Sequence, residues 1–478
     1  MKIFAKYMSL IALFFAFSAC DSELAIEPEQ SLSPEVTFSN EAGAQAALLG
    51  AYSATQSLDV YGGLSFVISE YMTDNVRFVG SFPTLQEINN YVTIASNTNV
   101  QGMWAAHYFA ILAANAVIDN VPGVVDPGFT DAERKQFIAE AKFIRALTYL
   151  QLVNLWGQPY QVNNGNTPGV PLILSGGALV GEIVKPARNT VAEVYTQIEK
   201  DLTEALPDVV NNFAVADQTR GRATKGGVNA LLSRVSLYKG DWAKTIQYAD
   251  AILNGNSVYA LASDFTFYDA NTSEDIFTIQ MTSTDNSRTG AGGLGGYYLP
   301  AARGGRGDAP MSASIIAAYG TGDKRLTSLS FTGTDATTVS STFTNKYKDG
   351  TTNADNAPVL RVTEILLNKA EALVKSTNSV NADAITLVNR LRTRAGLTPF
   401  EAAQFADANA LITAILNERR LELAFEGHRR MDLLRNGLPL RTSGATGPIS
   451  KPGDPKVILP IPTREIDLGA ALPQNTGY

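Results

Sequence analysis

The sequence predicts a mostly α-helical protein, in which tetratricopeptide-like helix pairs form a scaffold and a loop-rich, irregular region carries short strands. Three observations lead to this fold class. Amphipathic segments with helical spacing recur along the chain, and short turns containing glycine join several of them. These segments fall into two blocks, about 100–255 and 358–435, and the residues between the blocks are rich in Thr, Ser, Gly and Asp. The spacing of the helices is too irregular for a regular repeat array.

The first segments of the chain read as helices with visible start and stop signals. The stretch SNEAGAQAALLGAYSATQS places Ala46, Leu49 and Tyr52 at helical spacing, which predicts that these three residues form its apolar face. The stretch WAAHYFAILAANAVIDNVPG repeats the pattern and stops at a Pro-Gly pair.

The clearest helix follows at 130–157. Thr130 and Glu133 have the spacing of a capping box, and Gly157 stands after the last turn. Its predicted apolar stripe consists of Phe137, Ala141, Ile144, Leu147 and Leu150.

Further helices are predicted at 188–208, 224–255, 360–376 and 382–397. The second of these is a pair joined by a tight turn at Lys239-Gly240-Asp241. Small residues allow neighbouring helices to approach closely, and we assign this role to Ala230, Ala249, Ala370 and Ala372. Between the blocks, the run DIFTIQM predicts a short strand, and the segments 61–99 and 257–357 read as long loops. Long loops in a compact protein usually carry function.

The first twenty residues have the order of a secretory signal. Lys2 and Lys6 precede an apolar run at 8–17, and the small pair Ser18-Ala19 comes before Cys20, the single cysteine of the chain. The run is too short to span a bilayer, which takes about 20 residues, but it suits a signal that is cleaved.

A small-small-Cys ending resembles the lipobox of bacterial lipoproteins, although Phe17 replaces the usual leucine. The resemblance implies cleavage before Cys20, lipid on its thiol and anchoring of the protein to a membrane. An ordinary secreted protein with a chance cysteine is the alternative. Asp21 and Glu23 resemble a signal for export to the outer face of the outer membrane, whereas in enterobacterial sorting Asp21 favours retention at the inner membrane.

The domain organisation follows from these features. We expect a lipoprotein signal peptide at 1–19, a flexible tether at 20–34 and one domain at 35–478, with an N-terminal part at about 35–256 and a C-terminal part at about 257–478.

Several functional classes are excluded by the sequence. The formal net charge is −8 and there are no basic clusters, which argues against nucleic-acid binding. The two histidines, His107 and His428, lie in helical patterns without metal-ligand spacing, so we read both as packing residues. GAGGLG neither follows a strand nor opens a helix, so it is not a dinucleotide site, and RGD at 306–308 is attributed to chance. We therefore predict no catalytic residue, no metal site and no cofactor.

The stretch ILNERRLELAFEGHRRMDLLRNG near the C-terminus resembles the signature of the SusD/RagB family of outer-membrane nutrient-binding lipoproteins. Further stretches resemble family landmarks in the same order, among them AEAKFIRALTYLQLVNLWGQPY, GRATKGGVNALLSRVSLYKGDW and ILPIPTREIDLGAALPQNTGY. The signature residues are Glu418, Arg419, Arg420, Glu422, Phe425, Glu426, Gly427, Arg429, Asp432 and Arg435. Read physically, its Glu418 and Glu422 form a salt-bridged helix face with Arg419 and Arg420, so the signature is structural.

The resemblance implies a lid on a SusC-like TonB-dependent outer-membrane barrel, lipid-anchored and facing outward, which binds an oligosaccharide or polysaccharide for import and does not cleave it. Two alternatives stay open. One is a RagB-like lid for peptides, and the other is a structural lid whose selectivity resides in the barrel.

The ligand is expected at the irregular segments 61–99 and 257–350, because family members build their ligand face largely from these regions. Trp104, Trp156 and Trp242 lie in the helical landmarks and are read as scaffold residues. The preferred platform is the pair Tyr297-Tyr298, expected in a flexible, glycine-flanked loop. The candidate contacts are Tyr61, Tyr71, Asp74, Asn75, Arg77, Phe78, Phe82, Tyr297, Tyr298 and Arg303.

Overall fold

A computed structural model describes residues 33–176, 186–255, 258–268, 270–287, 292–441, 450–468 and 472–478. Cys20, the signal segment and most of the tether fall outside these residues. The described chain is dominated by helices with two small sheets, which confirms the predicted fold class. No helix in these ranges is both long enough and apolar enough to cross a membrane.

The helices differ widely in length. Residues 34–253 carry α2 (Pro34–Thr37), α3 (Glu41–Thr55), α4 (Leu64–Tyr71), α5 (Pro83–Asn89), α6 (Thr98–Asn120), α7 (Asp131–Trp156), α8 (Val191–Ala205), α9 (Ala216–Gly221), α10 (Lys225–Lys239) and α11 (Trp242–Leu253). The second half carries α12 (Gly293–Tyr298), α13 (Ala313–Ala318), α14 (Lys324–Leu329), α15 (Val362–Thr377), α16 (Ala382–Arg394), α17 (Ala408–Leu423), α18 (Arg429–Leu434) and α19 (Thr463–Asp467).

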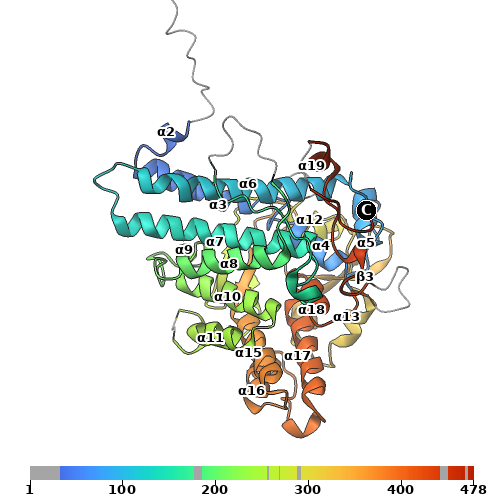
Figure 1. Ribbon diagram of the computed structural model, residues 1–478. Coiled ribbons are helices and arrows are strands. Elements are labelled where there is room, and N and C mark those ends of the chain that lie inside the picture. The colour runs from blue at the N-terminus through green and yellow to red at the C-terminus, as the bar shows by residue number, and fades with distance from the viewer. Residues whose placement is uncertain are drawn as a thin grey trace, which may run out of the picture.

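The long helices pack in succession. Helix α6 contacts α3 and α7, α7 contacts α8, and α10 contacts α11. Helix α15 joins the two blocks, because it contacts α11 on one side and α16 and α17 on the other. Figure 1 shows α6 and α7 as two long rods across the upper part of the molecule, with α8, α10, α11, α15 and α16 stacked beneath them.

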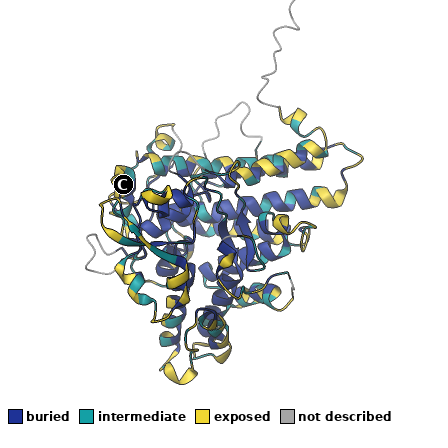
Figure 2. Cartoon of the chain, turned by 180° about the vertical axis from the view of Figure 1, so that it is seen from behind, coloured by how far each residue is buried: buried dark blue, intermediate teal, exposed yellow. Residues whose placement is uncertain are grey.

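Helix α7 lies at the centre of the N-terminal block. Its predicted capping box is confirmed, since the Thr130 hydroxyl accepts from Glu133 N and the Glu133 carboxylate accepts from Thr130 N. The five predicted stripe residues are all buried. Burial extends beyond that stripe to nearly every residue from Gln136 to Trp156, because α3, α6, α8 and α10 surround the helix. Figure 2 shows this buried interior in dark blue, with exposed residues at helix ends and in connecting loops.

Helix α3 buries a different face from the predicted one. Ala44, Leu48 and Ala51 are fully buried, whereas Leu49 is 49% exposed. The helix is rich in alanine, so two different stripes of apolar residues along it have helical spacing. Close packing against α6 and α7 selects the stripe that contains the smaller side chains.

Two antiparallel strand pairs make up the sheets. Strand β1 (Asp275–Ile279) pairs with β4 (Ala357–Arg361), which confirms the predicted strand in DIFTIQM, and β2 (Ser330–Thr334) pairs with β3 (Ser340–Thr344). The segment 61–99 was expected to be a loop, but α4 and α5 lie within it.

Candidate ligand-binding site

Backbone pairing brings the two irregular segments together. An antiparallel bridge joins Val76 to Met311, and the amides of Arg77 and Val79 donate to the carbonyls of Pro310 (2.9 Å) and Asp308 (2.8 Å). Met311 N in turn donates to Thr342 O in β3 at 2.8 Å. We call the resulting surface the loop face, made of residues 76–82, 303–311 and the β2–β3 hairpin 330–344. The early loop and the insertion, expected from sequence to share one face, are therefore adjacent.

Three side chains stack at one end of the loop face. The guanidinium carbon of Arg306 lies 4.7 Å from the ring centroid of Phe82 and 4.3 Å from that of Tyr297. Phe82 is 48% exposed and Tyr297 is 3% exposed. Burial, partly offset by Arg306, raises the pKa of Tyr297 to about 12, so its hydroxyl stays neutral. The stack therefore offers an exposed aromatic surface beside a cation, a combination that suits the apolar face and hydroxyl edge of a sugar ring.

Two further arginines are anchored on the hairpin. The exposed Arg303 lies 3.6 Å from the Phe331 ring centroid and donates to Asn345 Oδ1 at 3.1 Å. Arg77 forms a 2.6 Å ion pair with the buried Asp335. Although burial opposes it, the pKa of Asp335 lies below its usual value, because Thr337, Val339, Arg77 and Ser341 donate to its carboxylate.

The predicted Tyr297-Tyr298 platform is wrong in its placement. Both residues belong to helix α12 and not to a loop, and Tyr298 is fully buried, stacked on Tyr347 at 5.6 Å and edge-on to Phe425. The glycines that precede these tyrosines allow the backbone of α12 to pack closely against residue 349, because a Cβ on Gly295 would lie 2.5 Å from Asp349 O. Neither ring presents a face to solvent.

Several other predicted contacts also lie in the interior. The hydroxyl of Tyr61 donates to Leu147 O at 3.1 Å, and the ring of Tyr71 packs 4.8 Å from that of Phe78. Asn75 is fully buried, donates to Glu70 and accepts from Arg420. Asp74 is partly buried and pairs with Arg429 at 2.8 Å, so it ties the early loop to the C-terminal signature. Of the ten predicted residues, the exposed ones are Arg77, Phe82 and Arg303, and Phe78 is half-buried.

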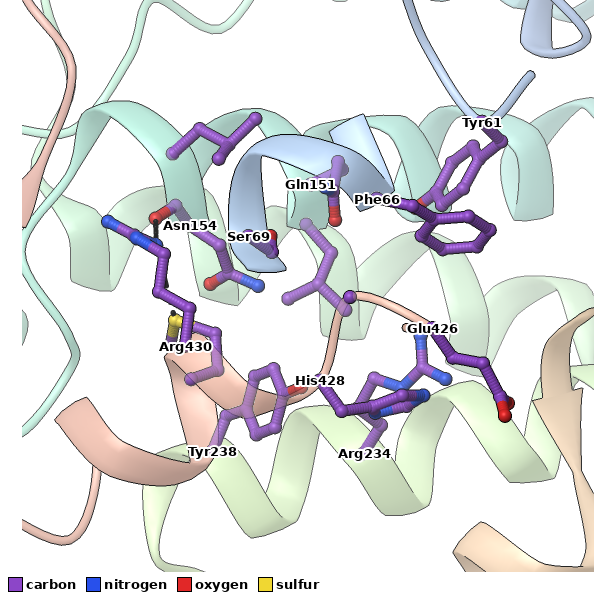
Figure 3. Close-up of a pocket in the computed structure, with 14 residues that line it drawn as sticks. Tyr61, Phe66, Ser69, Gln151, Asn154, Arg234, Tyr238, Glu426, His428 and Arg430 are labelled. Atoms are coloured by element: carbon purple, nitrogen blue, oxygen red, sulfur yellow. Dashed lines mark hydrogen bonds between the residues drawn. The ribbon is translucent and has the colours of Figure 1, made fainter. Parts of the chain in front are cut away.

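A small cavity of about 20 Å³ lies between Tyr61, helices α4, α7 and α10, and the C-terminal signature (Figure 3). The side chains of Tyr61, Arg234, Glu426 and His428 line it. A space of this size holds about one water molecule, so it cannot admit a sugar ring. The predicted structural role of the signature agrees with this geometry.

The carboxylates of the signature are buried ion-pair partners. Glu418 pairs with Arg325 (2.8 Å) and Arg392 (2.5 Å), and Glu422 pairs with Arg394. The prediction of paired glutamates is therefore confirmed, but the partners come from other elements and not from the neighbouring Arg419 and Arg420. Both glutamates are buried, so they do not form an exposed helix face.

The histidines and tryptophans are packing residues, as predicted. His107 and His428 are buried, and burial lowers the pKa of each to about 4, so both rings are neutral. Trp104 and Trp156 are buried and meet edge-to-face at 5.3 Å. Trp242 is half-buried at the start of α11.

Sequence reasoning missed Arg306, a residue of the loop face. The RGD tripeptide that contains it was attributed to chance, and only the pairing of 308–311 with 76–79 brings Arg306 over Phe82.

Two family models match this chain. One, described as "SusD family", matches residues 316–478, and the other, described as "Starch-binding associating with outer membrane", matches residues 26–237. Together they cover more than half of the sequence. The chain belongs to the SusD/RagB family. The family resemblance is thus confirmed over residues 26–237 and 316–478.

Full-length relatives agree with the SusD/RagB assignment. SusD-like protein P2 of Formosa agariphila is 28% identical, over 99% of this chain and 100% of that protein. A SusD superfamily protein from Bacteroides fragilis has a TM-score of 0.79 at 26% identity, covering 90% of this chain and 98% of its own. A putative sugar-binding protein from Bacteroides vulgatus has a TM-score of 0.78 at 26% identity, covering 91% and 98%. This SusD/RagB chain therefore shares its fold with solved relatives over about nine-tenths of its length.

Proposed function

We propose that this SusD/RagB protein is a cell-surface glycan-binding protein that acts as the lid of a SusC-like TonB-dependent barrel. It binds an oligosaccharide or polysaccharide at the loop face and delivers it for import without cleaving it. The observation that carries the proposal is the stack of Phe82, Arg306 and Tyr297, because an exposed ring next to a cation is the kind of surface on which a pyranose ring packs. The names of the relatives, a putative sugar-binding protein among them, support a glycan over a peptide.

Two predicted residues extend the proposed contact surface. Arg303 and Arg77 are exposed and held in place by Phe331 and Asp335, so their remaining N–H groups are positioned without further ordering. Fixed donors suit the hydroxyl oxygens of an oligosaccharide. Tyr61, Tyr71 and Tyr298 are buried and are not proposed as contacts.

The anchor is proposed to be Cys20. A lipid on its thiol, followed by the tether 20–34, would keep the protein beside the barrel and raise its effective concentration there. The family model described as "associating with outer membrane" supports this location.

Affinity electrophoresis through gels that contain soluble polysaccharides tests the binding proposal. We expect retardation by at least one polysaccharide and its loss in a Phe82→Ala/Arg306→Ala double variant that keeps the wild-type melting temperature. Undiminished retardation of the double variant would show that the loop face is not the site.

The anchor and the barrel need separate tests. Cys20→Ala should abolish partitioning into detergent, and an intact mass of the wild-type protein without added lipid would refute the anchor. Purification from native membranes in mild detergent should recover a large outer-membrane barrel together with the protein. Repeated recovery of the protein alone would count against the lid.

A further inference from the structure

A groove with a volume of about 750 Å³ lies between α3, α9 and the end of β1, away from the Phe82 stack. Its size falls within the range of 300–1,000 Å³ that is typical of small-molecule sites. Three elements far apart in the sequence form its walls, and nothing described above uses it.

The α3 wall includes Leu49 and Tyr52, two of the three residues that the sequence predicts as the apolar face of this helix. Gln45, Leu49 and Ser53 follow each other at intervals of four residues, so they form one exposed stripe. Gly50 stands beside them, and a Cβ at this position would meet no atom within 4 Å. A glycine inside a helix lowers helix stability relative to alanine, and no packing contact explains it here. Its effect is to leave the groove wall without a side chain at that point.

The floor of the groove is polar and fixed in place. The buried Glu140 accepts from Tyr52 Oη at 2.7 Å and from both Nε (2.9 Å) and Nη2 (2.6 Å) of Arg222. The hydroxyl of Tyr52 also accepts from Ala223 N at 2.8 Å. Gln56 Nε2 donates to Gln280 O at 2.8 Å. These groups are held by one another, so a ligand would meet a preorganised surface.

The charge and hydrogen-bonding character of the lining indicate the class of ligand. The positive charge of Arg222 is matched by Glu140, while Asp217 and Asp285 are exposed carboxylates, so the groove disfavours an anion. The exposed amides of Gln45 and Gln218 can both donate and accept, as sugar hydroxyls do. Leu49 and the ring of Tyr52 provide apolar surface for the C–H face of a sugar.

From this lining we infer that the groove beside α3 is a second glycan-binding site, which takes a neutral oligosaccharide. The inference rests on the proposed function for the nature of the ligand. An extended peptide would gain most of its affinity by adding to a strand edge. At the end of β1 this edge is already occupied. The carbonyl of Gln280 accepts from Gln56, and Gly221 of α9 lies so close to the Gln280 side chain that a Cβ on Gly221 would be 2.6 Å from Cγ of Gln280.

The groove and the loop face lie on two sides of the same turn. The turn begins at Gln56, which lines the groove, and ends at Gly63, where a Cβ would lie 3.3 Å from the Tyr297 ring. A long glycan chain that passes this turn can contact both sites, and simultaneous contact raises the apparent affinity for a polymer over that for a short oligosaccharide.

The test compares two substitutions of Gly50 in the full-length protein, which is kept in detergent. Gly50→Leu fills the groove wall, whereas Gly50→Ala adds one methyl group, and both replace glycine by a better helix former. Gln218→Ala on α9 is an independent variant of the opposite wall. Affinity gels containing soluble starch, arabinoxylan or galactomannan measure binding, and gels containing casein provide an unfolded polypeptide for comparison.

We expect Gly50→Leu and Gln218→Ala to weaken binding of the retained polysaccharide roughly tenfold, as loss of one good contact would, while Gly50→Ala binds like wild type. All three should melt at or near the wild-type temperature. Equal binding by Gly50→Leu and Gly50→Ala, with loss of binding only in the Phe82→Ala/Arg306→Ala variant, would overturn the second site and leave the proposed function standing. Retardation by no polysaccharide would overturn both, and retardation by casein that Gly50→Leu weakens would overturn the assignment to sugar.

Discussion

Arg306 places its guanidinium carbon 4.7 Å from the ring centroid of Phe82, although the two residues are distant in the sequence. The contact exists because the backbone of 76–79 pairs with that of 308–311, which aligns the two loops side by side. One exposed ring and one cation thus form a surface that neither loop could provide alone.

Replacement of Phe82 by alanine should weaken glycan binding without unfolding the protein. The ring is 48% exposed, so little core packing depends on it. Loss of an aromatic-cation surface should cost about 1–2 kcal/mol of binding free energy, or roughly fivefold to thirtyfold in affinity. Phe109→Ala is the matched control, because this ring is 66% exposed on α6. Equal loss of affinity in both variants, measured by titration calorimetry, would contradict a specific role for Phe82.

Substitutions of Tyr298 should separate packing from ligand binding. The ring is fully buried against Tyr347 and Phe425, so Tyr298→Ala should lower the free energy of unfolding by about 3–5 kcal/mol. Its hydroxyl has no hydrogen-bond partner in the described part of the chain, so Tyr298→Phe should change stability by less than about 1 kcal/mol. Urea denaturation of both variants checks this. Reduced glycan affinity in a stable Tyr298→Phe protein would restore Tyr298 as a ligand contact.

Stability should depend on pH through Glu70. Burial raises the pKa of its carboxyl group to about 7, even though Asn75 and Gly427 donate to it. The folded protein therefore holds a proton that the unfolded chain releases at lower pH. The contribution of protonated Glu70 to stability is complete below a pH of about 4.5, the pKa of this group in the unfolded chain. It is lost as the pH rises through about 7.

Comparison of wild type with Glu70→Gln isolates this contribution. Between pH 5 and pH 8 the unfolding free energy of the wild type should fall relative to the variant by up to about 3 kcal/mol. Urea denaturation at several pH values measures the difference. A constant difference between the two proteins across this range would exclude the titration of Glu70.

Removal of Arg325 should be severely destabilising. Its guanidinium pairs with Asp323 (2.7 Å) and Glu418 (2.8 Å), and its side chain is 1% exposed. Arg325→Met would leave the buried Asp323 without its cation and Glu418 with Arg392 alone, at a cost of about 3–5 kcal/mol. Lys142→Met is the control, since the pair of Lys142 with Glu204 is partly exposed and should contribute less than about 1 kcal/mol. Similar stabilities of the two variants would contradict this account of the buried network.

The sequence by itself determined the long helices and several of their ends. The capping box at Thr130 and Glu133, the stop at Gly157 and the turn at Gly240 are local interactions, and all three appear in the structure. The burial of Trp104 and Trp156 also followed from local helical spacing. Such features depend on neighbours within a few residues, which is why one sequence suffices to predict them.

Tertiary structure decided the exposure of several other side chains. Tyr298 stands in a glycine-rich stretch that resembles a loop, yet long-range packing against Tyr347 and Phe425 buries it. Leu49 has core spacing on α3, yet α6 and α7 contact the opposite stripe and leave it in the groove. Arg306 joins Phe82 only because two distant loops pair. Exposure depends on contacts between residues remote in the chain, and no local pattern specifies those contacts.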